Sequence, residues 1–294
     1  MSQLVETTRT FFFSSDENLG AVNKDLKGSR FQVRLNTPLS VPPTAIDVAI
    51  ECIAANIWYV SPNIAEEYGN NRLHLVYYST PLNLTPITIT IPDGLYGTDT
   101  LNAVVQRQIA TFQIPDGTSN FVPTSIALFE NPATQRVVIS LSNKLGFDAN
   151  PIPGPGKNNI AETLGFTNSF TASYTGETFE ADEVAKFNRI NSYLLHTDLV
   201  QDGISINSQY DSILTEVQLN ARPGDLLAYR PFIPYRVSGK HLKYGNKDFL
   251  TFYLTDEQNR PVDTFGENYS FTIIVKYKIR EHTSMLGINV PHLN

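Results

Sequence analysis

The five histidines of the chain are its most suitable residues for binding a transition metal. Metal sites commonly draw two imidazoles from positions separated by one or three residues. No two histidines of this sequence lie at such a spacing; they are His74, His196, His241, His282 and His292. The sequence therefore predicts no metal site, and each histidine is expected at the surface or hydrogen-bonded in a core.

The single cysteine, Cys52, is the one thiol that could act as a nucleophile. It lies in the largely apolar run 50–57 without a basic neighbour to stabilise a thiolate, so we expect a buried core residue. The Gly-x-Ser-x-Gly pattern of serine hydrolases does not occur, and residues 154–157, Gly-Pro-Gly-Lys, lack the spacing of a phosphate loop. The sequence therefore predicts no catalytic residue, no cofactor and no enzymatic activity.

A run of basic side chains near the C-terminus is interleaved with Tyr235 and Tyr244 and contains no acid before Asp248. Such a run suits either a nucleic acid or an acidic protein surface. Because the whole chain carries a net charge of −7, we favour contact with an acidic neighbouring subunit and expect no specific nucleic-acid site. The candidate subunit-interface residues are Arg230, Arg236, Lys240, Lys243 and Lys247.

The composition describes a folded protein with few charges. Charged residues make up 17% of the 294 residues, against roughly 25% in an ordinary soluble domain. The lone cysteine excludes zinc ribbons, iron–sulfur sites and disulfide scaffolds. The charge is unevenly distributed: residues 182–221 carry 2 Lys+Arg and 6 Asp+Glu, whereas residues 222–294 carry 10 and 7. A surface with few charges and two oppositely charged regions is typical of subunits that are covered by neighbours.

Alternation of apolar and polar residues predicts a mainly β fold with eight strands outside the middle third of the chain. Eight strands is the number in a single jelly roll. The run 269–279 alternates well and is expected to be a half-buried antiparallel strand. The predicted strands are Thr10–Ser14, Arg30–Leu35, Ile46–Tyr59, Ile190–Leu199, Ile213–Leu219, Pro231–Val237, Phe249–Leu254 and Tyr269–Ile279.

The middle third has a different pattern and predicts an α+β domain inserted between the third and fourth strands. Apolar residues at spacings of three and four predict a helix over 98–112. We therefore assign residues 1–69 and 182–294 to the jelly roll and 70–181 to the inserted domain. The other elements expected in the insertion are strands Leu73–Ser79 and Ile87–Ile91, a hairpin of Ser125–Phe129 with Arg136–Leu141, a Pro/Gly linker Pro151–Lys157, and a short helix Asn159–Leu164.

Several short motifs occur in an order that resembles a known family. They are Ile57–Ile64 (IWYVSPNI), Asn70–Leu73 (NNRL), Ile87–Tyr96 (ITITIPDGLY), Leu101-Asn102 and Leu164–Phe166 (LGF). In this order the chain resembles the penton proteins, the minor capsid proteins at the vertices, of virophages and Polinton-like viruses. The resemblance covers most of the chain, from about residue 11 to residue 279.

The resemblance implies a structural virion protein. Five copies of an upright jelly roll would form the vertex of an icosahedral capsid, beside the major capsid protein and with the inserted domain on the outer surface. A host-cell receptor would then be a further partner, acting through the insertion. The resemblance brings no catalytic residues. It also implies synthesis in the host cytoplasm, in agreement with an N-terminus that shows no signal peptide and a sequence with no membrane span.

A second reading of the sequence remains open. A jelly-roll adhesin or glycan-binding module acting in host attachment would also account for a mainly β chain, with exposed Tyr and Asn residues of the insertion as the binding groups. The two ends, Ser2–Thr8 and His282–Asn294, lie outside the strand pattern. They are either arms that dock on adjacent capsid proteins or fraying termini.

Overall fold

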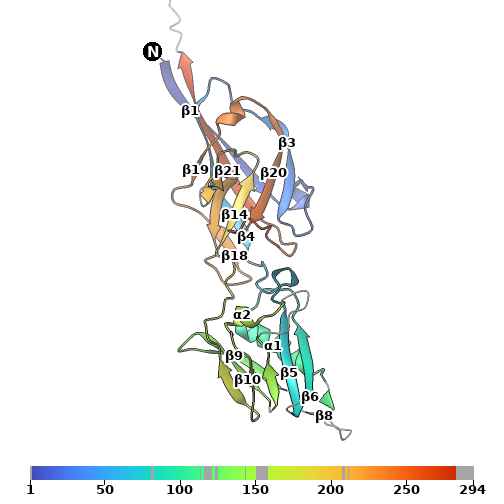
Figure 1. Ribbon diagram of the computed structural model, residues 1–294. Coiled ribbons are helices and arrows are strands. Elements are labelled where there is room, and N and C mark those ends of the chain that lie inside the picture. The colour runs from blue at the N-terminus through green and yellow to red at the C-terminus, as the bar shows by residue number, and fades with distance from the viewer. Residues whose placement is uncertain are drawn as a thin grey trace, which may run out of the picture. The chain divides into compact units, whose positions relative to one another are not determined.

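The computed structural model shows a mainly β chain with several antiparallel sheets (Figure 1). The linker expected at Pro151–Lys157 and the C-terminal segment 283–294 lie outside the described residues. The structure describes residues 2–80, 83–112, 114–115, 121–122, 125–142, 144–149, 158–206, 209–210 and 212–282.

The chain forms two compact units, Met1–Val60 with Ile190–Asn294, and Ser61–Arg189. The sequence places the edges of the insertion at 70 and 181, inside the second of these units. Residues 61–69 pack with the second unit because the backbones of Ile64 and Gly94 exchange hydrogen bonds, N–H to O at 3.2 and 2.9 Å. These bonds are made between segments thirty residues apart, so no local pattern marks the boundary.

The first sheet of the first unit has the order β1-β21-β4-β18, and β19 pairs with β4 beside β18. Its strands are β1 (Ser2–Ser14), β21 (Ser270–His282), β4 (Ile46–Trp58), β18 (Leu226–Tyr229) and β19 (Arg236–Ser238). All of these pairs are antiparallel. Strand β1 therefore forms one edge of the sheet, and β18 with β19 forms the other.

The second sheet of the first unit has the order β17-β14-β20-β3-β2, again antiparallel throughout. Its strands are β17 (Ile213–Gln218), β14 (Ser192–Thr197), β20 (Lys247–Thr255), β3 (Arg30–Leu39) and the short β2 (Ala21–Val22). Apart from the consecutive strands β2 and β3, most neighbours within both sheets come from distant parts of the chain. The unit therefore depends mainly on long-range pairing.

Aromatic side chains from both sheets meet between them and form the centre of this core. The rings of Phe13 and Phe252 lie 4.7 Å apart, and those of Phe252 and Phe271 also lie 4.7 Å apart. Phe31 packs on the same cluster, and the buried hydroxyl of Tyr269 donates to the Ser29 carbonyl at 2.7 Å. The alternation seen in 269–279 thus points its apolar residues into this core, as the sequence predicts.

The predicted strand Pro231–Val237 is wrong. The structure has two short strands here, β18 and β19, joined by a loop over residues 230–235. Pro231 and Pro234 have no backbone N–H, so this stretch cannot continue the hydrogen-bond ladder with β4. The apolar residues that suggested a strand instead project from the loop.

The prediction that Ser2–Thr8 lies outside the strand pattern is also wrong. These residues belong to β1, which pairs with β21 along its whole length, from Ser2↔His282 to Ser14↔Ser270. The pairing of β21 with β4 ends at Lys278↔Ile46, so the first residues of β1, Ser2–Val5, pair with β21 alone (Figure 1). A two-stranded ribbon has no sheet face to bury, which is why its sequence shows no clear alternation.

The described part of the second unit contains the sheets β13-β10-β9 and β12-β11-β5-β6, the two-stranded pair β7-β8, and two α-helices. The predicted helix over 98–112 is present as α1 (Thr98–Ile109), and the predicted hairpin is formed by β9 and β10. The elements are β5 (Arg72–Thr80), β6 (Asn83–Thr90), β9 (Ile126–Asn131), β10 (Arg136–Leu141), β11 (Leu145–Phe147), β12 (Phe170–Thr171), β13 (Glu177–Glu180) and α2 (Ala161–Leu164).

Short elements complete the described part of the chain. They are η1 (Glu17–Leu19), η2 (Glu66–Tyr68), η3 (Lys240–Lys243), β7 (Ile114–Pro115), β8 (Phe121–Val122), β15 (Ser205–Ile206) and β16 (Gln209–Tyr210). Of these, η3 has a direct bearing on the candidate site. It follows β19 and carries two of the predicted interface lysines.

Buried asparagines connect the motifs that carry the family resemblance. The amide of Asn63 donates to the Tyr96 carbonyl at 2.7 Å, and the Tyr96 N–H donates back to Asn63 Oδ1 at 2.8 Å. Asn70 accepts from the Ala65 N–H and donates to the Asn63 carbonyl and to Thr163 Oγ1. Three motifs that are separate in sequence therefore form one hydrogen-bonded cluster in the second unit, which gives these residues a structural role.

Candidate subunit interface

A loop at the edge of the first sheet is attached at its start by Arg230. The Arg230 guanidinium donates to the Tyr229 carbonyl at 2.7 Å and to the Ala55 carbonyl at 3.2 Å. It also donates to Asn56 Oδ1 at 3.3 Å. Arg230 is thus engaged with its own chain, and it fixes the start of the 230–235 loop to β4.

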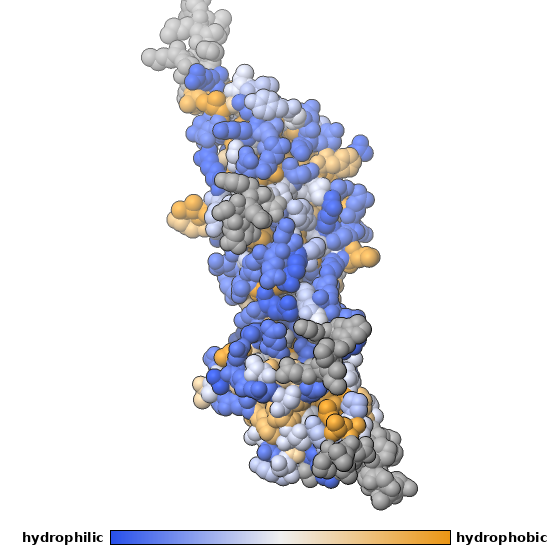
Figure 2. Space-filling view, viewed as in Figure 1, coloured by the Kyte–Doolittle hydropathy of each residue, from blue (hydrophilic) through white to orange (hydrophobic). Residues whose placement is uncertain are grey.

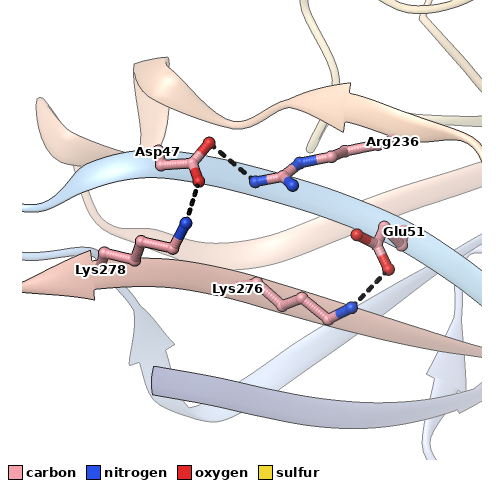
Figure 3. Close-up of polar contacts among 5 residues, drawn as sticks. All are labelled: Asp47, Glu51, Arg236, Lys276 and Lys278. Atoms are coloured by element: carbon pink, nitrogen blue, oxygen red, sulfur yellow. Dashed lines mark hydrogen bonds and ion pairs between the residues drawn. The ribbon is translucent and has the colours of Figure 1, made fainter. Parts of the chain in front are cut away.

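The end of the loop is fixed by a second arginine. Arg236 Nη2 lies 2.7 Å from Asp47 Oδ1, and Lys278 Nζ lies 2.9 Å from Asp47 Oδ2 (Figure 3). The hydrogen bond from Lys278, helped by Arg236, lowers the pKa of the Asp47 carboxyl. All three residues are partly exposed, so the cluster aligns β4, β19 and β21 more than it stabilises the fold.

A neighbouring ion pair on the same strands has a buried carboxylate and a partly exposed lysine. Lys276 Nζ lies 2.8 Å from Glu51 Oε2, and Glu51 is only 6% exposed (Figure 3). Both pairs join β21 to β4. Loss of the ionic partner costs far more free energy for a carboxylate that is removed from water than for an exposed one.

The three lysines of the predicted interface differ from the two arginines. Lys240 and Lys243 lie on η3, and Lys247 starts β20. Within the described residues, none of the three forms an ion pair with a carboxylate. The structure thus separates the predicted set into two arginines that fix a loop and three lysines whose charge is available to a partner.

Two clefts open beside η3. The larger, about 610 Å³, lies between β1 with β21 on one side and the turns around residues 40–43 and 242–246 on the other. The smaller, about 390 Å³, shares Leu242 and residues 244–246 and adds Gln201, His241 and Lys247. Exposed cations and clefts are therefore concentrated at this end of the first unit.

The β18–β19 loop presents the most exposed apolar side chains of this sheet edge. Phe232 is 100% exposed, Ile233 79% and Tyr235 52%. Figure 2 shows hydrophobic surface projecting at the left margin of the first unit, where this loop runs in Figure 1. Sequence reasoning assigned these residues to a strand; the two prolines were the signal that could have identified the loop.

His241 faces this end of the unit in an unusual environment. Within the described residues, its Nε2 is buried and has no hydrogen-bond partner. Burial lowers the pKa of His241, with a further lowering by Lys247, while Asp202, the Leu199 carbonyl and Asp198 act in the opposite direction. Burial also raises the pKa of Asp198. His241 is therefore expected to be neutral in the folded protein at pH 7.

Replacement of His241 with glutamine is expected to reduce the loss of stability of the first unit as the pH falls below about 6.5. Because the pKa of His241 is lower in the folded state, the unfolded state binds more protons below that pH, and acidification favours unfolding. Urea unfolding followed by the fluorescence of Trp58, the only tryptophan of the chain and a residue of β4, would measure this at pH 7.5, 6.5 and 5.5. Equal pH dependence in the two proteins would contradict it.

The structure places Cys52 and His196, whose side chains are of types that could do chemistry, in the core. No group of three or more His, Cys, Asp or Glu side chains among the described residues could hold a metal ion. Cys52 is buried, and burial raises the pKa of its thiol to about 12. His196 is also buried, stacks on Tyr253 and hydrogen-bonds Thr255. Among the same residues, no helix is long and apolar enough to cross a membrane.

Comparison with known proteins gives matches among solved structures. No protein family matches the sequence, and no curated protein matches it. Among solved structures, the chain is similar to the crystal structure of the selenomethionine-labelled mavirus penton protein. The two are 9% identical and superpose with a TM-score of 0.47, over 94% of this chain and 100% of that one.

Proposed function

We propose that the chain is a structural virion protein, a penton of which five copies form the vertex of an icosahedral capsid. In this proposal the first unit is a single jelly roll and the second unit is an insertion between its third and fourth strands. The insertion lies on the outer surface of the shell, where a host-cell receptor would reach it. The jelly roll contacts the other copies and the neighbouring major capsid protein.

The strand order of the first unit carries this proposal. Counting β18 and β19 as one interrupted strand and leaving out the short β2, β15 and β16, the described part of the first unit has eight strands. The first sheet then has the order first, eighth, third, sixth, and the second sheet fifth, fourth, seventh, second. This order supports a jelly roll, since two Greek keys in that fold would produce it, and many viral capsid proteins use the fold.

The surface of the first unit supports self-association. A chain with 17% charged residues has less surface suited to permanent contact with water than an ordinary monomer. The apolar loop and Lys240 are exposed on the first unit, and Lys243 and Lys247 are half-buried; within the described residues none of these lysines pairs with a carboxylate, so the group is suited to contact a further protein. Copies related by a rotation axis other than a twofold contact one another through two different patches. The apolar loop and the group of lysines could supply two such patches.

Charge reversal on η3 tests the proposed assembly. We expect the wild-type protein to sediment as a pentamer and the double variant Lys240→Glu, Lys243→Glu to associate at least tenfold more weakly, because like charges would meet at the interface. Sedimentation velocity over a range of protein concentrations measures this.

The matched control is Arg72→Glu with Arg107→Glu, which changes the net charge equally but lies in the second unit. A wild-type protein that is monomeric at every concentration would contradict the proposed function. Equal association of the two double variants would contradict the role of the lysines.

A further inference from the structure

We propose that the larger cleft beside η3 binds an acidic saccharide, a sugar that carries a carboxylate or a sulfate group. The anionic group contacts Arg9 and Lys243, and the sugar hydroxyls bond to neutral polar side chains of the same cleft. The site lies in the first unit, whereas the proposed receptor contact lies in the second. The inference goes beyond the proposed function and does not depend on pentamer formation.

A buried tyrosine presents a free hydroxyl to this cleft. Tyr277 of β21 is only 8% exposed and lines the cleft. Within the described residues, its hydroxyl has no hydrogen-bond partner, and it is not among the polar atoms that are fully removed from solvent. The hydroxyl therefore reaches solvent at the cleft. A tyrosine hydroxyl that is largely buried usually has a partner, and here a ligand oxygen would supply it.

The two cations of the cleft have no acidic neighbour within it. Arg9 and Lys243 line the cleft, and none of its described lining residues is a carboxylate. Arg9 Nη1 lies 3.5 Å from the Ser40 carbonyl oxygen, and its guanidinium carbon lies 5.5 Å from the centroid of the Phe11 ring. These contacts leave most of the five N–H donors of the guanidinium available. An anionic group in the cleft would thus accept charge-assisted hydrogen bonds without repulsion from a carboxylate.

Neutral polar side chains outnumber the cations in this cleft. Ser40, Tyr244 and Asn246 are exposed and line it, and within the described residues their side chains have no hydrogen-bond partner. Hydroxyl and amide groups both donate and accept, which suits the hydroxyls of a sugar. The ring of Tyr244, 84% exposed, offers an apolar face to sugar C–H groups.

This lining favours a saccharide over a polyanion. An acidic peptide or a nucleic acid presents a row of negative charges, which is matched by a row of cations. The cleft has two cations, and the whole chain carries a net charge of −7, which repels long polyanions. A sugar with one acidic group fits the two cations and the larger number of neutral groups.

Hydrogen bonding between two turns holds the cleft in shape. The Val41 N–H donates to the Leu242 carbonyl at 3.3 Å, which joins the turn over 40–43 to the turn over 242–246. The first turn contains two consecutive prolines, which restrict its backbone. The volume of about 610 Å³ is within the range of sites that bind small molecules. A site that is already formed loses little conformational entropy when the ligand binds.

Three sugars with the same core test the class of ligand. They are 3′-sialyllactose, which carries a carboxylate, lactose 3′-sulfate, which carries a sulfate, and unmodified lactose. Saturation-transfer NMR with the wild-type protein should show that at least one of the acidic sugars binds, with a Kd of about 1 mM or lower, and that lactose binds at least tenfold more weakly. The preferred acidic sugar identifies the anionic group.

Two outcomes of this titration would overturn the proposal. One is the absence of binding by both acidic sugars, or equal binding by lactose. The other is tighter binding of a hexaglutamate peptide than of either acidic sugar, which would assign the cleft to an acidic protein segment.

Two substitutions in the cleft locate the site. Arg9→Gln should weaken binding of the acidic sugar at least tenfold, because it removes a charged donor, and Tyr277→Phe should weaken it about fivefold. Both leave unchanged Lys243, which also belongs to the proposed subunit interface. Sugar binding is measured on the protein in whichever oligomeric state it adopts, so a monomeric wild type would reject the penton and leave this inference standing.

Arg34→Gln is the matched control. Arg34 is another arginine of the first unit that lies over an aromatic ring, 5.7 Å from the centroid of Phe249, but it does not line the cleft. Its substitution should leave the affinity for the sugar unchanged. Tyr277→Phe removes a hydroxyl without a partner, so the midpoint of urea unfolding should also stay the same. Equal affinities of all the variants and the wild type, or an equal loss in Arg34→Gln, would contradict the proposed site.

Discussion

Replacement of Gly165 with alanine is expected to destabilise the second unit by about 3 kcal/mol or more. Gly165 ends α2 with a φ of +86°, a conformation that L residues adopt only at a cost. A Cβ at this position would lie 2.2 Å from the Glu183 carbonyl oxygen and 2.8 Å from its carbon. Because both atoms belong to the backbone, the segment that follows β13 would have to move.

Gly176 is a matched control for this prediction. Its φ is also +86°, but an added Cβ would have nothing within 4 Å. Gly176→Ala should therefore cost only about 1–2 kcal/mol, the conformational cost without the clash. Hydrogen exchange resolved by segment would show the loss of protection in α1 and β5, while Trp58 fluorescence reports that the first unit stays folded. Equal effects of the two substitutions would contradict the clash.

Replacement of Lys276 with methionine is expected to destabilise the first unit by about 3–5 kcal/mol. The substitution removes the partner of Glu51 but leaves its carboxylate buried between β4 and β21 (Figure 3). Urea unfolding followed by Trp58 fluorescence measures the loss. Adding Glu51→Gln to the same chain should recover part of it, because a neutral amide costs less to bury than an unpaired charge.

Lys278→Met provides the comparison. Lys278 lies two residues along the same strand, but its partner Asp47 is partly exposed and keeps Arg236. The expected loss is at most about 1 kcal/mol. If the two lysine substitutions lower the free energy of unfolding equally, burial of Glu51 does not determine the size of the loss.

The sequence predicts the elements whose pattern is local. The alternation in 269–279 corresponds to the inward-facing residues of β21, and the spacing over 98–112 corresponds to the buried face of α1. Both patterns arise because a strand or a helix buries one face against a core. The short β-hairpin of β9 and β10 is predicted for the same reason.

Features that depend on distant partners could not be predicted. Nothing local distinguishes Ser2–Thr8 from a free arm, because its strand conformation comes from β21 at the other end of the chain. Likewise, Arg230 and Lys243 belong to one basic run in the sequence. Only the fold shows that the guanidinium of Arg230 is used by Ala55 and Asn56, whereas Lys243 has no carboxylate partner among the described residues.

Assembly is the main property that we propose for this chain, and the symmetry of the isolated protein tests it most directly. Electron microscopy of the purified wild-type protein, combined with native mass spectrometry, gives both the rotational symmetry and the number of 32.8 kDa copies in each particle. We predict rings with fivefold symmetry and a mass of five chains. Particles of one chain at every concentration, or closed rings of another order, would contradict the proposed penton.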